Sequence, residues 1–195
     1  KTERQALDSI GGGASHQGVA AYVSAYAYAQ MDDILAKAQS VGEEPFVIIL
    51  DGLEDPHNLG AIMRTAECAG AHGIIIPKRN SCGLTETVAK TSAGAIEYMP
   101  CVKVSNIVRT IDELKTMGFW IAACDMGGQE YYRTDLRGKL AVVIGGEGNG
   151  ISRLVKEACD FTVSMPMKGK ITSLNASNAA AVLMYEVRRQ RDGER

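Results

Sequence analysis

The sequence has no apolar run of the length that a membrane crossing requires, and its first residues form no hydrophobic signal core. A transmembrane helix needs about 20 consecutive apolar residues. A secretory signal places an apolar stretch behind a basic start. Since both features are missing, we expect a cytoplasmic protein without a membrane partner.

Cysteine and histidine are scarce and scattered. No two of the five cysteines stand at C-x-x-C spacing, and the three histidines are isolated from one another. Zinc sites usually draw ligands from closely spaced pairs, so the sequence predicts no metal. An odd number of scattered cysteines is typical of thiols in a reducing compartment.

An excess of positive charge is also missing, because the formal net charge is −2. Nucleic-acid-binding domains often carry a broad basic surface. Without one, contact with RNA must come from local groups of basic residues, at 78–79, at 168 and 170, and at 188–191. We assign 188–191 to a solvated surface, where basic residues complement the dipole of a helix end. We favour a functional role for Lys168 and Lys170, which lie in the strand-to-helix loop of the segment 164–177.

Apolar strand-like segments alternate with helical segments along most of the chain. This alternation predicts an α/β domain built on a parallel sheet, and the pattern alone favours a Rossmann topology. A chain of 195 residues has room for one such domain and a small addition. A short helix capped by Asp32 is expected before the first strand. The expected strands are 46–50, 73–77, 101–104, 119–124, 140–145 and 161–165. One helix is expected to begin at Asn58, and four others are expected to span 84–92, 106–117, 151–158 and 175–190. The segment 126–139 is expected to be a loop.

Two stretches, 140–150 and 164–177, each join an apolar strand to a following helix through a loop of glycine and small polar residues. Parallel α/β sheets bind ligands outside the carboxyl ends of their strands, and glycine lets a ligand approach the backbone. Neither stretch fits a familiar loop. The dinucleotide pattern fails at Ile151, the P-loop pattern fails at Ile171, and the G-x-S-x-G elbow is absent. The two loops predict a ligand site of another kind.

Three segments resemble the motifs of the SpoU (TrmH-type) RNA ribose 2′-O-methyltransferases. Motif one is the sequence DPHNLGAIMR at 55–64, motif two is IGGEGNG at 144–150, and motif three combines MPMKG at 165–169 with SLNAS at 173–177. The three motifs stand in the order that this family shows. Asn178 departs from the family, which usually has an apolar or small residue there, but it follows the end of motif three.

The resemblance implies the SPOUT fold, a parallel sheet flanked by helices with a C-terminal trefoil knot. It also implies S-adenosylmethionine as the cofactor and no metal. The residues that it implies for cofactor binding are Gly145, Gly146, Met165 and Leu174. Those that it implies for catalysis are Asn58, Arg64, Glu147, Ser173 and Asn175.

The roles of these polar residues stay open at this point. Arg64 could be the general base, although a guanidinium pKa above about 12 makes that demanding, or it could clamp an RNA phosphate. Glu147 could hold Arg64 by charge pairing. Outside the motifs, Asn58 and Asn175 would be assigned to helix capping alone, and Glu147 and Ser173 to solvated turns.

The first part of the chain resembles the end of a different domain. In many relatives a small RNA-binding domain similar to ribosomal protein L30e precedes the catalytic domain, and the segment 16–19 resembles the end of that domain. We expect 1–44 to be the tail of a truncated L30e-like domain plus a linker, and 45–195 to be the methyltransferase domain. Tyr22, Tyr26 and Tyr28 all stand at even-numbered positions, so in an extended segment their side chains would lie on the same side. We expect these side chains to pack against the protein rather than to stack on bases.

The resemblance implies methyl transfer to a ribose 2′-hydroxyl of RNA, most specifically to a guanosine of 23S rRNA in the peptidyl-transferase region. Transfer RNA is the alternative substrate. Two alternatives of other classes are a nicotinamide-dependent oxidoreductase and a non-catalytic RNA-binding relative. The dinucleotide pattern lacks its third glycine, which disfavours the oxidoreductase. The motif residues are intact, which disfavours the non-catalytic relative. The family also implies a homodimer.

Overall fold

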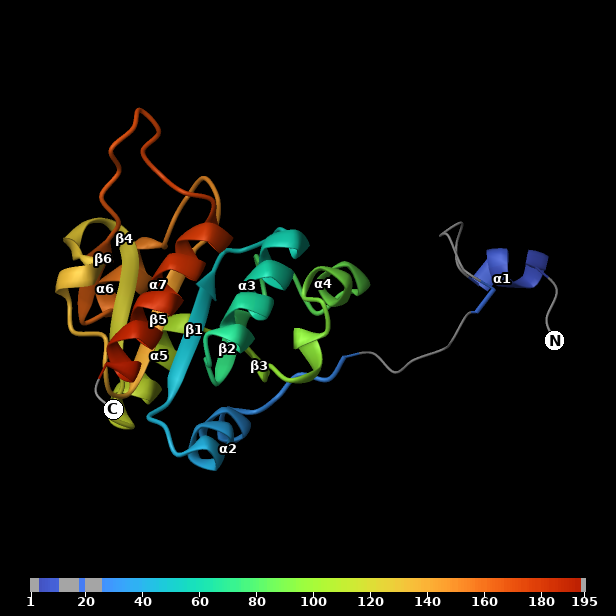
Figure 1. The fold of residues 1–195 in the computed structure, drawn as a ribbon, viewed down its shortest axis with the longest axis horizontal. Coiled ribbons are helices and arrows are strands. Elements are labelled where there is room, and N and C mark those ends of the chain that lie inside the picture. Colours follow the sequence, from blue (N-terminus) through green and yellow to red (C-terminus); the bar gives the residue numbers. More distant parts are fainter. Residues whose placement is uncertain (1–3, 11–17, 20–25, 194–195) are drawn as a thin grey trace.

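The computed structural model describes residues 4–10, 18–19 and 26–193, and a six-stranded parallel sheet forms its centre (Figure 1). The strand order is β3-β2-β1-β5-β4-β6. This sheet confirms the predicted α/β class. The strands are β1 Phe46–Asp51, β2 Gly73–Pro77, β3 Cys101–Val104, β4 Trp120–Glu130, β5 Leu140–Gly145 and β6 Phe161–Ser164.

Helices follow most of the strands along the chain, as the sequence predicts. Figure 1 shows α3, α4 and α7 together on one face of the sheet. The helices are α1 Arg4–Ile10, α2 Met31–Val41, α3 Pro56–Cys68, α4 Glu86–Thr91, α5 Ile107–Thr116, α6 Arg153–Ala158 and α7 Ala176–Asp192, with 3₁₀ turns η1 Ala95–Glu97 and η2 Tyr131–Arg133.

The two faces of the sheet build two separate apolar cores. Ile48 and Leu50 of β1 join the core beneath α3 and α7, whereas Val47 and Ile49 join the core beneath α2, α5 and α6. A parallel strand covered on both faces needs apolar residues at successive positions. This explains why 46–50 is a continuous apolar run and leaves polar residues only beyond its carboxyl end, at Asp51 and the loop that follows.

The sheet reverses its winding between β1 and β5. β1 is followed by α3 on one face, and the neighbouring β5 is followed by α6 on the other face. The chain therefore leaves these neighbouring strands toward opposite faces, and the region outside their carboxyl ends is the usual ligand position in an open α/β sheet. The trefoil knot stays a prediction of the family resemblance.

Several predicted boundaries are wrong. The segment 126–139 is not all loop, because β4 continues to Glu130 past an irregularity between Cys124 and Gln129. Helix α3 begins at Pro56, not at Asn58, and the Asp55 side chain caps it by accepting a hydrogen bond from the His57 nitrogen. Proline suits the first helical position because no intrahelical partner exists there for a backbone N–H.

The polar residues at the start of α2 and the end of α7 also differ from expectation. Asp32 does not cap α2; Asp33 accepts a hydrogen bond from the Gln30 nitrogen at 2.7 Å. Arg188 does not lie on a solvated surface, since it binds both carboxylate oxygens of Glu43 at 3.0 and 2.8 Å. This pair ties α7 to the segment that leads into β1.

The tyrosine segment is described in part, because Tyr22 lies outside the described residues. Tyr28 packs as expected: its hydroxyl accepts a hydrogen bond from the Leu84 nitrogen at 3.0 Å, and Lys103 lies over its ring. Among the helices in the described ranges, none combines the length and apolar character that crossing a bilayer demands. The expected L30e-like tail in 1–44 remains a prediction.

Candidate active site

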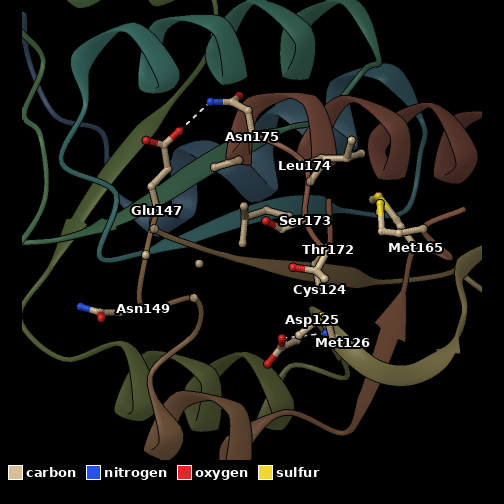
Figure 2. Close-up of a pocket in the computed structure, with 18 residues that line it drawn as sticks. Cys124, Asp125, Met126, Glu147, Asn149, Met165, Thr172, Ser173, Leu174 and Asn175 are labelled. Carbon is tan, nitrogen blue, oxygen red and sulfur yellow. Dashed lines mark hydrogen bonds between the residues drawn. The ribbon is translucent and has the colours of Figure 1, made fainter. Parts of the chain in front are cut away.

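Three side chains from the three motifs form one hydrogen-bonded cluster. Asn58 donates to Oε1 of Glu147 at 3.0 Å, and Asn175 donates to the same oxygen at 2.6 Å. Asn175 also donates to Oδ1 of Asn58 at 3.0 Å. Figure 2 shows the side chains of Glu147 and Asn175 pointing toward one another. The cluster joins the start of α3, the loop after β5 and the start of α7.

Asn175 has two roles at once. Its side-chain oxygen accepts hydrogen bonds from the backbone nitrogens of Ser177 and Asn178 at the start of α7, so the capping interpretation is correct. Its side-chain nitrogen remains free for Glu147 and Asn58, so that interpretation is incomplete. Capping orients the amide, because an oxygen fixed on the helix end turns the nitrogen toward the cluster.

Asn58 is not a helix cap, because it lies inside α3 and is only 5% exposed. A buried amide needs partners for both its oxygen and its nitrogen. Here Asn175 satisfies the oxygen and Glu147 accepts from the nitrogen. Its position therefore depends on the other two motifs being in place.

The motif-two loop is held by backbone contacts that only glycine allows. The Gly146 nitrogen donates to the Asp51 oxygen at 2.8 Å, which brings this loop against the one that follows β1. A Cβ added to Gly146 would lie 2.0 Å from the Gly52 carbonyl oxygen. Gly148 and Gly150 adopt positive φ angles of 89° and 64°, and the loop turns back there. In addition, the side-chain Oδ2 atom of Asp51 accepts from the Ser152 nitrogen at 2.7 Å.

A cavity of about 580 Å³ lies beside this cluster (Figure 2). We call it the cofactor cavity, after the ligand that the sequence resemblance implies. Its walls come from the middle of β4, the carboxyl end of β5 with the loop that follows it, the segment after β6 and the start of α7. The structure brings seven of the nine predicted site residues to these walls: Gly145, Gly146, Glu147, Met165, Ser173, Leu174 and Asn175. Met165 and Leu174 supply apolar surface, and Leu174 is 43% exposed.

Arg64 is the predicted residue that the structure leaves apart. It is exposed on α3 and lines neither this cavity nor the one described below. Glu147 hydrogen-bonds to the two asparagines, and in the described part of the chain no ion pair joins Arg64 with Glu147 or with Glu67. The expectation that Glu147 holds Arg64 is therefore wrong.

Sequence reasoning missed the contribution of β4. Cys124, Asp125 and Met126 line the cofactor cavity. Asp125 forms an ion pair with Lys156 of α6 at 2.6 Å. The signal was present, because ligands gather at the carboxyl ends of neighbouring parallel strands and Asp125 follows a predicted strand. Burial raises the pKa of the Cys124 thiol to about 11, which makes it a poor nucleophile near neutral pH.

No metal centre emerges from the residues that the structure describes, which contain no group of three or more His, Cys, Asp or Glu placed to hold an ion. The polar groups at the cluster are amides, one carboxylate and backbone atoms. This set suits an organic ligand that offers hydrogen-bond donors and acceptors.

Comparison with known proteins identifies a family. Residues 45–185 match the model of the SpoU rRNA Methylase family. The chain is 55% identical over 190 residues to YacO of Bacillus subtilis, which is assigned to the TrmH family of tRNA/rRNA methyltransferases; the match covers 97% of this chain and 76% of YacO. A TrmH family protein of Staphylococcus epidermidis is 54% identical over 180 residues, covering 91% of this chain and 72% of that protein.

Solved structures agree with the sequence matches. The SpoU methyltransferase AviRb from Streptomyces viridochromogenes, in complex with the cofactor AdoMet, superposes with a TM-score of 0.78 at 28% identity over 87% of this chain and 64% of AviRb. The A. aeolicus TrmH/SpoU tRNA modifying enzyme gives 0.71 at 26% identity over 84% and 85%. This chain thus spans less than two thirds of the AviRb chain.

Proposed function

We propose that this chain, which belongs to the SpoU rRNA methylase family, methylates a ribose 2′-hydroxyl of RNA, with a guanosine of 23S rRNA as its preferred target. Family membership makes it an S-adenosylmethionine-dependent RNA methyltransferase. The observation that carries the finer proposal is the cluster of Asn58, Glu147 and Asn175, which presents a fixed carboxylate beside a cavity of cofactor size.

The residues of the cofactor cavity fit S-adenosylmethionine. Its volume of about 580 Å³ lies within the range of small-molecule sites. Gly145 and Gly146 line the cavity with backbone atoms rather than side chains, and Met165 and Leu174 offer apolar contact for an adenine. Asp125 and Glu147 place negative charge around a cationic ligand. The bound cofactor supplies a methyl carbon made electrophilic by its sulfonium.

The ribose hydroxyl is a poor nucleophile until a base takes its proton. We assign this role to Glu147. The two asparagine amides occupy its Oε1 atom, which leaves Oε2 to accept the hydroxyl hydrogen bond and then the proton. Ser173 lines the same cavity and offers a hydroxyl to the ribose.

Arg64 then serves as a phosphate clamp rather than as the base. Its guanidinium is exposed and is not engaged by Glu147, and a planar guanidinium binds phosphate oxygens in a bidentate manner. Lys168 and Lys170 are exposed on the segment after β6, beside the cavity. The net charge of the chain is −2. These three cations therefore provide the local points at which it can contact RNA phosphates.

Transfer RNA is the second candidate substrate. The names of the bacterial relatives include both tRNA and rRNA, and the A. aeolicus neighbour is a tRNA modifying enzyme. The family assignment removes the nicotinamide-dependent oxidoreductase from consideration. A non-catalytic RNA-binding relative is disfavoured because the cluster is complete.

We further propose a cytoplasmic homodimer. The last helix supports the dimer, because Val182 and Tyr185 of α7 are 38% and 52% exposed. The two residues are three positions apart and so share one face of the helix, which is where a second chain would pack.

The test of the function is methyl transfer to unmodified RNA. The protein, S-adenosylmethionine and either 23S rRNA or total tRNA are incubated, and mass spectrometry maps 2′-O-methylated nucleotides. A new 2′-O-methylguanosine in 23S rRNA is the expected result. Methylation of tRNA alone would favour the second candidate. Transfer to a base atom, or no transfer by the longest natural form of the chain, would contradict the proposal.

A further inference from the structure

A second cavity, of about 680 Å³, lies on the other side of the motif-two loop. It shares Gly146, Glu147, Asn149 and Gly150 with the cofactor cavity, so this loop is the wall between the two. The cluster spans that wall: Asn58 lines the second cavity, and Asn175 lines the first. The remaining walls come from the segments that follow β1, β2 and β3 and from the start of α6.

We propose that this second cavity is a base pocket, which receives the base of the nucleotide to be methylated and selects guanine through the carboxylate of Glu54. The proposal rests on the proposed function and deepens it, because it gives the target nucleotide a position and a chemical identity. It uses residues outside the cluster and outside the cofactor cavity.

Position is the first argument. A ribose whose hydroxyl reaches Glu147 must lie at the wall between the cavities, since Glu147 lines both. When the cofactor fills the first cavity, the base attached to that ribose is left with the second. Enzymes that modify a nucleotide inside folded RNA or DNA commonly flip it into such a pocket.

Charge is the second argument. Asp51, Glu54, Asp55 and Glu147 line the pocket, and Arg79 is the single cationic residue among the lining residues. This balance disfavours a phosphodiester, because like charges repel at short range. A neutral base that offers N–H groups suits these carboxylates. The phosphates of the RNA are therefore expected outside the pocket, toward Arg79 at its rim.

Hydrogen bonding singles out one carboxylate. Asp51 already accepts from the Ser152 nitrogen, and Asp55 from the His57 nitrogen. Glu54 is exposed and forms neither a hydrogen bond nor an ion pair with the described residues. Both of its oxygens are available. Guanine has two adjacent donors, N1–H and the 2-amino group, which match the two oxygens of one carboxylate, whereas the Watson–Crick edges of adenine, cytosine and uracil lack this pair.

Apolar side chains complete the pocket. Leu53, Ile107 and Val155 are buried in its walls, and Leu154 is 59% exposed beside them. An extruded base loses its stacking neighbours and regains part of that contact on apolar side chains. The lining thus offers apolar surface for the face of a purine and a carboxylate for its edge.

The test measures nucleoside binding by NMR titration of the ¹⁵N-labelled protein saturated with S-adenosylhomocysteine. Guanosine is expected to shift the amide signals of Glu54 and Ser152. Inosine, which lacks the 2-amino group, is expected to bind about tenfold more weakly, as for the loss of one arm of a bidentate contact. Glu54→Gln is expected to weaken guanosine binding about tenfold and to remove the difference between the two nucleosides. Glu67→Gln, which removes an exposed carboxylate of α3 outside both cavities, is the matched control and should change nothing.

Two outcomes would overturn the base pocket. In the first, guanosine at millimolar concentration leaves these amide signals unshifted. In the second, S-adenosylhomocysteine displaces guanosine, which would place guanosine in the cofactor cavity.

A methylation assay on RNA separates this failure from failure of the proposed function. Transfer to a ribose with unchanged base preference in Glu54→Gln refutes the pocket and keeps the function. Guanosine binding that depends on Glu54, without any ribose methylation, keeps the pocket and refutes the function.

Discussion

The side-chain nitrogen of Asn175 lies 2.6 Å from Oε1 of Glu147, while the side-chain oxygen of the same asparagine accepts from the Ser177 nitrogen at 2.9 Å. One amide therefore fixes a helix end with one atom and a carboxylate with the other. One substitution of Asn175 alone could not distinguish these two roles, but two different substitutions can.

Asn175→Ser keeps a capping oxygen and removes the amide donor, whereas Asn175→Ala removes both. We expect both variants to lose methyl transfer at least about 100-fold, as when a general base is misplaced. Only Asn175→Ala should also lose stability, by about 1 kcal/mol for a lost cap. Single-turnover methylation and thermal unfolding measure the two effects. Normal turnover in Asn175→Ser would show that the contact with Glu147 has no catalytic role.

Gly146→Ala should disrupt the motif-two loop. Its Cβ would lie 2.0 Å from the carbonyl oxygen of Gly52, and the nearest atoms all belong to backbone, which cannot rotate away as a side chain can. We expect a loss of S-adenosylmethionine affinity of at least about tenfold, because the loop forms a wall of the cofactor cavity.

Gly94→Ala, outside both cavities, is the matched control for Gly146→Ala. Its Cβ would meet nothing within 4 Å, although its φ of 91° is strained for alanine. That strain costs about 1–2 kcal/mol without moving the wall. Calorimetric titration should therefore find near-normal cofactor affinity in this variant. Equal affinity loss in the two variants would refute the packing argument.

Sequence periodicity located the sheet well, because strands buried on both faces are continuous apolar runs. β3 and β5 have the predicted bounds, and Gly118, which follows α5, has a positive φ. Capping positions were less predictable. Asp55, Asn58, Asp32 and Asp33 are all plausible caps by residue type, and only backbone geometry decides which side chain reaches a free N–H.

The partners of Glu147 could not be predicted from the motifs. Charge pairing with Arg64 is favourable in principle, but the fold brings the amides of Asn58 and Asn175 to this carboxylate instead. The contribution of Asp125 was missed for a related reason. The expected strand 119–124 ends where the register of β4 becomes irregular, between Cys124 and Gln129, so Asp125 and Met126 lay beyond the expected strand and outside the three motifs.

Arg64→Ala should abolish methyl transfer while leaving cofactor affinity near wild type, since Arg64 lies outside the cofactor cavity. Arg64→Lys should keep part of the activity if the residue clamps a phosphate, because an ammonium supplies charge without the planar fork. Methylation assays and calorimetric titration of both variants give the answer. Wild-type turnover in Arg64→Ala would refute a role in the reaction.

Tyr185→Glu should shift the proposed homodimer toward monomer, because it introduces a charge on the exposed apolar face of α7. The matched control is Met117→Glu at the end of α5, where a 42% exposed apolar side chain lies on a different helix. Sedimentation velocity at micromolar concentration measures both. A wild-type protein that sediments only as a monomer would contradict the dimer.

His72 is buried at 2% exposure, and its Nδ1 atom accepts a hydrogen bond from the Phe46 nitrogen at 2.9 Å. Protonation of Nδ1 would break this bond. Burial, with a smaller effect of nearby Arg191, lowers the pKa of His72 from 6.5 to about 4. The folded protein therefore holds this imidazole neutral under conditions in which the unfolded chain protonates it.

Between pH 6.5 and about 4 the unfolded chain binds more protons at His72 than the folded protein does, so the free energy of unfolding should fall as the pH falls through this window. The full effect is up to about 3 kcal/mol. Chemical denaturation at pH 7 and pH 5 measures it, above the range in which most carboxylates titrate. His72→Asn retains an acceptor for the Phe46 nitrogen but cannot titrate, so its unfolding free energy should change less between these pH values. His57→Asn, at an exposed position, should keep the wild-type difference. A difference that persists in His72→Asn would mean that another group causes the acid sensitivity.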